Sequence, residues 1–245
     1  MFEGKWANTP ELLSEAQRIR YQVYCVEKPF ENPAEHPDGR ERDEFDSHSV
    51  HGLLVNAVSK APVGTVRLVM HRPGAPGGSL PIHRLCRHPD VHNSSVLPLA
   101  TTAETSRFAI SKVFRRGTEC LSFGRTDQWE EIPRDASRLI SHITVGLIAI
   151  ALQLAMAHGI THICAVMEPA LLRLLSRFGV HFRPLGAQVE WHGWRQPCYT
   201  TVAKMLSEIE RERRDLWEAV TERGVQWSQS RELICPSQRE IVEFA

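Results

Sequence analysis

Ala103-Glu104-Thr105-Ser106-Arg107-Phe108-Ala109-Ile110 is a strand-like stretch that carries two opposite charges among small and apolar residues. Simple alternation predicts that Glu104, Ser106, Phe108 and Ile110 share one face of a strand, and that Thr105, Arg107 and Ala109 share the other. Charged side chains are rarely buried unless they are paired. We therefore expect both Glu104 and Arg107 to have partners elsewhere in the chain.

Candidate partners come from segments that precede this strand. The segment Gly39-Arg40-Glu41-Arg42-Asp43-Glu44-Phe45-Asp46 supplies three carboxylates, namely Glu41, Asp43 and Asp46. Arg20 lies before this segment, and Arg67 follows it within Gly64-Thr65-Val66-Arg67-Leu68.

Four motifs occur in the order and spacing of acyl-homoserine-lactone synthases. They are Arg20-Tyr21-Gln22-Val23-Tyr24, Glu41-x-Asp43-x-x-Asp46, Gly64-Thr65-x-Arg67-Leu68 and Glu104-x-Ser106-Arg107-Phe108. Within that superfamily the chain resembles the PEP-CTERM/exosortase system-associated acyltransferases, which are also related to N-acyl amino acid synthases. The resemblance covers residues 10–205. It implies an α/β (α+β), GNAT-like acyl-CoA N-acyltransferase fold, with a mixed central sheet, splayed middle strands and flanking helices.

Length and composition point to an ordinary cytosolic globular protein. The 245 residues suffice for one large domain or a domain with an appendage, and the zero net charge gives no sign of a nucleic-acid binder. Six scattered cysteines without a Cys-x-x-Cys pair indicate reduced thiols. No secretory signal opens the sequence, and the longest apolar stretch, residues 143–157, is too short to span a bilayer. We expect a cytoplasmic protein without a transmembrane segment.

Periodicity predicts the order of the elements. The predicted helices cover residues 10–24, 136–158 and 169–179, and the predicted strands cover 51–59, 63–69, 104–110, 160–167, 180–191 and 198–205. The polar residues 26–50 and 71–98 are predicted loops, the first long enough to suggest function. We expect an acyltransferase domain over residues 1–205 and a C-terminal helical extension over 206–245, with a charged helix at 206–223 and a loosely held end at 232–245.

One of these loops brings together residues that could ligate a metal: His83, Cys86, His88 and His92. Imidazole and thiolate suit zinc, but this spacing fits no recognised ligand pattern and no second cluster completes it. Surface histidines are the favoured interpretation, and we expect no metal.

Basic residues follow the central strand at Arg115, Arg116 and Arg125. In the GNAT fold, the turn after this strand opens a helix whose N-terminal amides receive the phosphate of the donor. The resemblance therefore implies that Arg115 and Arg116 bind the donor phosphate. An ordinary basic surface is an equally good interpretation.

The resemblance implies transfer of a fatty acyl group from a thioester to an amine, by direct attack in a ternary complex. Glu104 is the candidate that accepts the amine proton or holds the ammonium, and Glu41 is the alternative base. Asp43 and Asp46 are expected to position the acceptor or to fix the loop. Arg20, Arg67 and Arg107 are expected to neutralise these carboxylates.

Ser106 is a candidate hydrogen-bond donor to the substrate, or it only fills a tight strand contact. The alternative for every member of the charged set is a salt-bridge network that only shapes the cleft. We expect no tightly bound cofactor. The resemblance implies an acyl carrier protein or coenzyme A thioester as the donor and a small amino-acid-like amine as the acceptor.

Phe30 marks a departure from the lactone synthases, which usually carry a tryptophan shortly after the Arg20–Tyr24 motif. This sequence has Glu27-Lys28-Pro29-Phe30 there, which argues against S-adenosylmethionine as the acceptor. Three hypotheses follow: an N-acyltransferase, with the exosortase system as its implied context; an autoinducer (acyl-homoserine-lactone) synthase; and a non-catalytic module that binds an acyl carrier.

Overall fold

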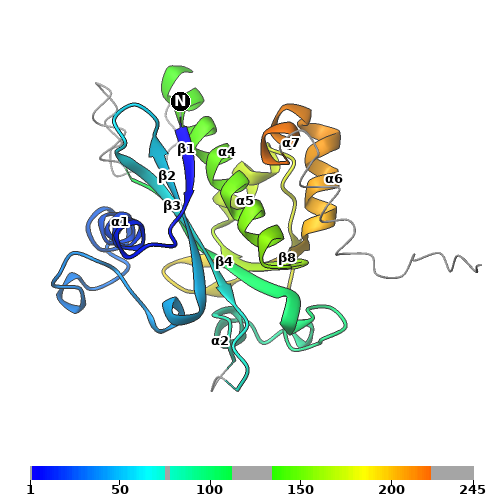
Figure 1. The fold of residues 1–245 in the computed structure, drawn as a ribbon. Helices are drawn as coiled ribbons and strands as arrows, with labels where there is room; N and C mark the ends of the chain where they lie inside the picture. The colour runs from blue at the N-terminus through cyan, green and yellow to red at the C-terminus, as the bar shows by residue number, and fades with distance from the viewer. Residues whose placement is uncertain (1, 75–77, 112–133, 222–245) are drawn as a thin grey trace, which may run out of the picture.

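The computed structural model describes residues 2–74, 78–111 and 134–221, and the remaining residues are outside the description. Its centre is an eight-stranded mixed sheet in the order β1-β2-β3-β4-β5-β8-β6, with β7 paired to β8 off this path. Figure 1 shows helices on both sides of the sheet. The predicted mixed sheet with flanking helices is confirmed.

The first four strands form an antiparallel meander. They are β1 (Phe2–Trp6), β2 (Ser49–Asn56), β3 (Pro62–Met70) and β4 (Thr102–Ile110). Strand β1 is absent from the sequence-based expectation. It pairs with β2 at the edge of the sheet and is only partly buried, so its sequence lacks the apolar alternation of a core strand.

One face of this meander is covered by α1 (Pro10–Tyr21), which begins after the capping residue Thr9 and has Pro10 in its first turn. A π-helical turn over Gln22–Glu27 extends it. Ala16, Ile19 and Val23 pack against residues of β2 and β4. We call this side of the sheet the α1 face.

Short helical turns lie in the long connections on the α1 face. They are the 3-10 turns Pro33–Glu35, Glu44–His48, Pro89–Val91 and Leu99–Thr101 and the short α2 (Ile82–Leu85). The predicted loops therefore carry local structure. A small apolar cluster under α2 joins Leu80 and Ile82 to Val69 of β3.

The opposite side, the α4 face, is covered by α4 (Arg134–Ala157). Its apolar residues Ile143, Leu147 and Ile150 belong to the main core, as the predicted stripe requires. Gly52 of β2 lets the helix approach closely, because a Cβ there would lie 2.2 Å from Cγ2 of Ile150. The bounds differ from the predicted 136–158 by one or two residues.

By length and composition, the window Ile140–Ala157 of α4 would suffice to cross a membrane, and it is the one such helix found in the described part of the chain. The estimate from residues 143–157 understated its length. Half of this window is buried inside the protein, where it packs on the sheet as a core helix.

Strands β4 and β5 (His162–Met167) are parallel neighbours that separate. They pair over only three positions, from Thr102–His162 to Glu104–Cys164. Beyond this point β4 continues to Ile110 and β5 to Met167 without pairing to each other. The predicted splayed middle strands are thus confirmed, and the gap opens at Glu104.

The C-terminal elements differ from the sequence-based expectation. After α5 (Pro169–Ser176) come two-residue strands, β6 (Arg183–Pro184) and β7 (Val189–Glu190), in place of one strand over 180–191. Strand β8 is Trp194–Thr201, so it begins four residues before the predicted strand 198–205, and the second half of that prediction is wrong.

Residues 202–220 form two helices, α6 (Val202–Glu212) and α7 (Arg214–Val220). Thr201 caps α6. The buried residues of both helices, including Leu206, Ile209 and Trp217, belong to the same core as α4. Helix α6 crosses residue 205, where the sequence analysis placed a domain boundary, and the predicted loose end at 232–245 lies outside the described residues.

Candidate functional site

A buried network of ion pairs lies on the α1 face. Arg20, fully buried at the end of α1, donates from Nε to Glu41 and from both terminal nitrogens to Asp46, at 2.6 and 3.0 Å. A planar guanidinium suits such two-point contacts. The pairing of Arg20 with the carboxylates of the 41–46 segment, predicted from the sequence, is present.

Arg67 in β3 completes the central part of the network. Its Nη1 donates to Asp43 at 2.6 Å and to Asp46 at 2.7 Å, and its Nε donates to Ser106 at 3.0 Å. Asp43 and Asp46 also form a capping box around the 3-10 turn Glu44–His48. Both aspartates therefore fix the loop on the sheet, and Ser106 binds Arg67.

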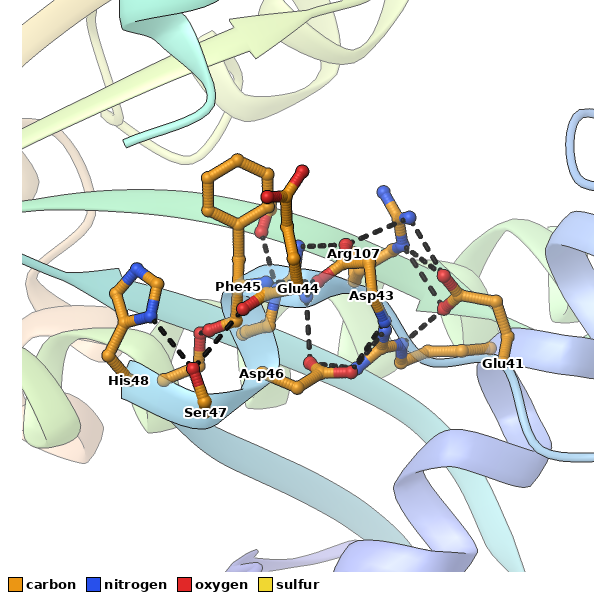
Figure 2. Close-up of polar contacts among 12 residues, drawn as sticks. Glu41, Asp43, Glu44, Phe45, Asp46, Ser47, His48 and Arg107 are labelled. Carbon is orange, nitrogen blue, oxygen red and sulfur yellow. Dashed lines mark hydrogen bonds and ion pairs between the residues drawn. The ribbon is translucent and has the colours of Figure 1, made fainter. Parts of the chain in front are cut away.

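Arg107 reaches the network because β4 contains a bulge. The pairing of β3 with β4 shifts register between Thr65 and Arg67, and Arg107 has a φ of 50° there. Its Nη2 donates to Glu41 at 2.8 Å and to Glu31 at 3.2 Å. Figure 2 shows the Arg107 guanidinium beside the Glu41 carboxylate.

The bulge overturns part of the predicted alternation. Glu104 and Ser106 do share the α1 face, but Phe108 and Ile110 pack into the core on the α4 face. Ala109 packs with the α1 cluster. One extra residue in the strand exchanges the faces beyond Ser106, and this brings Arg107 to the side of the carboxylates.

The arginines keep the network carboxylates ionised. Burial acts to raise the pKa of Glu41, but Arg107 and Arg20 outweigh it and lower this pKa to about 2. Burial likewise opposes the lowered pKa values of Asp43, set by Arg67, and of Asp46, set by Arg20. All three groups remain negatively charged at neutral pH.

Glu104 behaves in the opposite way. Its carboxyl group is 2% exposed, and burial raises its pKa to about 8, against the opposing effect of the hydrogen bond from the Ile82 N–H at 2.6 Å. Its hydrogen-bond partner is thus a backbone amide of α2, where an arginine was expected. A carboxyl group with a pKa near the working pH suits proton transfer.

A cavity of about 860 Å³ passes through the gap between β4 and β5. On the α1 face it is lined by polar groups, among them Asp43, Glu104 and Ser106. On the α4 face it is lined by apolar side chains of α4, α5 and α6, including Leu152, Leu171 and Met205. Its volume is within the range of pockets for small molecules.

Phe30 is one of the residues that line the cavity. Its ring stacks on His192 at 5.2 Å between centroids, and the Arg195 guanidinium lies 5.6 Å from the ring centroid. His192 and Arg195 were not predicted from the sequence. His192 lies in the β7–β8 turn and Arg195 near the start of β8, and no local pattern marks them as part of the site.

Glu31 and His51 were also missed. Glu31 accepts a hydrogen bond from Arg107 and lines the cavity. His51 is buried in β2, with Nε2 3.6 Å from Asp46, and burial and Arg20 lower its pKa to about 4. The sequence offers one weak signal for each residue. Glu31 is a charged residue in a polar loop, and His51 is an imidazole within an otherwise apolar strand.

The possible metal ligands of the second loop do not converge. The ring of His83 lies beside that of His92, whereas Sγ of Cys86 donates to the Leu185 carbonyl. Within residues 2–74, 78–111 and 134–221, no group of three or more His, Cys, Asp or Glu side chains is placed to hold a metal ion. The candidate phosphate-binding residues Arg115 and Arg116, and Arg125, lie outside the described residues.

Residues 19–123, which hold all four motifs, match the family model of an acetyltransferase (GNAT) domain. No curated protein matches the chain. The family match covers the α1 face of the site and the whole of β4.

Solved structures share this fold. TofI, in a ternary complex with an inhibitor and MTA, matches with a TM-score of 0.57 and 20% identity, covering 86% of this chain and 96% of its own. BjaI, a CoA-dependent acyl-homoserine lactone synthase with MTA bound, matches with a TM-score of 0.55 and 19% identity over 91% of this chain and 88% of its own. MesI, another CoA-dependent acyl-homoserine lactone synthase, has a TM-score of 0.53 and 21% identity, with 88% and 95% covered. The fold is GNAT-like, and the family match is to an acetyltransferase domain.

Proposed function

We propose that the protein is an N-acyltransferase that moves a long-chain fatty acyl group from an acyl carrier protein or coenzyme A thioester to the amine of a small amino-acid-like acceptor. The observation that carries this proposal is the cavity through the sheet, with Glu104 where the two strands part. A cavity that is polar on one face and apolar on the other suits a reaction between an amine and an acyl chain.

The apolar half of the cavity supports a hydrocarbon substrate. Leu152 of α4, Leu171 of α5 and Met205 of α6 line it, and each comes from a different helix. Burial of each methylene group there contributes about 0.8 kcal/mol. The acyl chain occupies this half, and the thioester carbonyl lies in the gap beside β4.

The chemistry in this proposal is a single acyl transfer. The free amine attacks the thioester carbon, a C–N bond forms, and the carboxylate of Glu104 accepts the amine proton, directly or through water. The bulge at Arg107 leaves backbone groups outside the regular ladder, and an N–H of residues 107–108 donates to the oxyanion. The C–S bond then breaks, and the thiolate that leaves takes a proton.

The ionisation of the two candidate bases favours Glu104 over Glu41. With a pKa of about 2, Glu41 is a weak proton acceptor, and two arginines occupy its oxygens. Glu104, with a pKa of about 8, is the stronger base once ionised. Glu41, Asp43 and Asp46 hold the loop and the arginines in place.

Lactone synthesis is the second candidate, since two of the structures that share the fold are described as CoA-dependent acyl-homoserine lactone synthases and BjaI has been solved with SAM and isopentyl-CoA. Phe30 at the mouth of the cavity argues for a different acceptor. The link to the exosortase system and the choice of carrier remain predictions of the sequence resemblance, and a cytoplasmic location remains a prediction from the cysteine pattern.

Incubation with long-chain acyl carrier protein or acyl coenzyme A and a panel of amines, with release of free thiol as the readout, tests the proposal. We expect thiol release that depends on the amine and an N-acyl product. Glu104→Gln is expected to lower kcat by about 10²- to 10⁴-fold, the usual contribution of a general base, without loss of folded protein by circular dichroism. Absence of turnover with every donor favours a binding module, and a lactone product formed from S-adenosylmethionine favours the second candidate.

A further inference from the structure

The cationic side chains that line the cavity are already paired within the described part of the chain. Arg67 pairs with Asp43, and Arg107 pairs with Glu41. Nearer the mouth, Arg195 lies 3.1 Å from Glu168. These guanidinium groups have carboxylate partners before any ligand arrives.

The remaining Lys and Arg side chains that line the cavity also have carboxylate partners. Arg84 makes a two-point contact with Glu44, with Nη2 donating to Oε2 at 3.0 Å. Arg42 pairs with Asp38, and the Lys28 ammonium lies 3.5 Å from Glu168. An acceptor that carries a free carboxylate would have to displace one of these internal partners.

Carboxylates outnumber cations on the same wall. Among the residues that the structure describes, eight Asp and Glu side chains line the cavity, against six Lys and Arg side chains. Glu104 is largely uncharged at neutral pH, but the remaining acidic groups still exceed the basic ones. Such a wall favours a cationic amine and disfavours an anionic substituent.

From these contacts we infer that the acceptor is an amino-acid-like amine whose carboxyl group is masked, as in an amide or an ester, or is absent. This inference rests on the proposed function and names the class of its acceptor. The ammonium enters among Glu31, Asp43 and Glu104, where it loses its proton before attack. A free α-carboxylate in the same place would face carboxylates, and the cations that the described residues supply there already have carboxylate partners.

Glu44 offers a way to change this preference without altering the catalytic groups. Its side chain is 62% exposed and that of Arg84 is 40% exposed, so their pairing contributes little to stability. Both residues line the cavity, and Figure 2 shows Glu44 on the loop next to Asp43. Glu44→Gln frees the Arg84 guanidinium to bind a substrate carboxylate.

The test compares matched amines, such as leucine with leucinamide and glycine with glycinamide, with the same long-chain thioester donor. We expect kcat/KM for the amide to exceed that for the free acid at least tenfold in the wild-type protein. In Glu44→Gln this ratio is expected to fall about fivefold or more, mainly through a lower KM for the free acid. Because the ratio is compared between variants, the different basicities of the two amines cancel.

Glu15→Gln is the matched control, since Glu15 pairs with Arg18 on the exposed side of α1, away from the cavity. It should leave the ratio unchanged. A wild-type preference for the free acids would overturn the inference and leave the acyltransferase proposal standing, as would an unchanged ratio in Glu44→Gln. Failure of every amine to release thiol would instead overturn the proposed function, and the inference with it.

Discussion

Glu104 and Glu41 are carboxyl groups of one cleft with opposite ionisation. Glu41 lies between two guanidinium groups, and its pKa is about 2. Glu104 is buried and accepts one backbone N–H, and burial raises its pKa to about 8. Their different environments move the two pKa values apart. Glu41 therefore carries a fixed negative charge, whereas Glu104 can accept and release a proton.

The pH dependence of turnover follows from the role of Glu104. With an acceptor whose amine is already deprotonated over the range studied, kcat should rise about tenfold per pH unit below pH 8 and level off above it. This rise should be lost in Glu104→Gln. A wild-type profile that is flat between pH 6 and about 8 would exclude proton transfer to a group of this pKa.

Glu41→Gln tests the structural role of the network. The substitution leaves the buried Arg20 and the half-buried Arg107 short of a counter-charge, and such a loss costs about 3–5 kcal/mol in the free energy of unfolding. Urea unfolding measures this cost. The exposed Glu15→Gln should cost less than about 1 kcal/mol, so equal losses in the two variants would contradict a buried network.

At the scale of the elements, the bulge in β4 sets the geometry of the site. Gly64 of β3 pairs with Ile110 just beyond the bulge. A Cβ at Gly64 would lie 2.9 Å from the Ala109 carbonyl oxygen, which is backbone and cannot rotate away. The close approach of the two strands at this point therefore depends on glycine.

Gly64→Ala is expected to destabilise the protein by about 1–3 kcal/mol and to lower kcat, because the strand that carries the bulge must move. Thermal unfolding and the thiol-release assay measure the two effects. Gly146→Ala is the control: its Cβ would meet Cδ1 of Leu54, the end of a flexible side chain, at 2.8 Å, and alanine favours the helix. A larger loss in the control would show that helix packing, and not the bulge, limits the fold.

Regular elements could be predicted from the sequence where one pattern dominates. The apolar stripe of α4 and the hairpin β2–β3 are examples. The alternation of β4 failed beyond Ser106, because a bulge changes the face of every later residue without changing composition. Strand β8 was extended too far, although Thr201 followed by Val202, Met205, Leu206 and Ile209 is a capped helical pattern.

The part of the site that consists of ion pairs could be predicted, because its basic and acidic residues occur in separate motifs of opposite charge. Arg20, Arg67 and Arg107 are paired with Glu41, Asp43 and Asp46 in the structure. The partner of Glu104 could not be predicted, since it is a backbone N–H of the short α2. Glu31 and His192 come from irregular segments, where periodicity carries no information on which side chains converge. Arg195 lies near the start of β8, which the sequence-based strand 198–205 did not include.

For the whole molecule, Glu41 and Glu104 make the free energy of unfolding depend on pH in opposite directions. The pKa of Glu41 is lowered, so the stability it contributes is present above its unfolded pKa of 4.5 and is lost as pH falls toward 2. The pKa of Glu104 is raised, so its contribution is present below pH 4.5 and is lost as pH rises through 8.

Substitution of Glu104 should therefore remove the dependence of the unfolding free energy on pH on the alkaline side of pH 4.5. In Glu104→Gln the decline of the unfolding free energy between pH 4.5 and 8, about 1.4 kcal/mol per unit for one group, should disappear. The decline below pH 4.5 should remain. Urea titrations across this range measure both limbs, and a wild-type slope that survives the substitution would assign the raised pKa to another group.

The passage through the sheet also bears on how a turnover ends. A finished amide would span the gap, with its head on the α1 face and its tail among α4, α5 and α6. Such a molecule has to be withdrawn lengthwise, and every added carbon deepens the hold by about 0.8 kcal/mol. The feature that selects a long tail thus also retards its departure, and with the longest tails the escape of product, not the making of the bond, sets the pace.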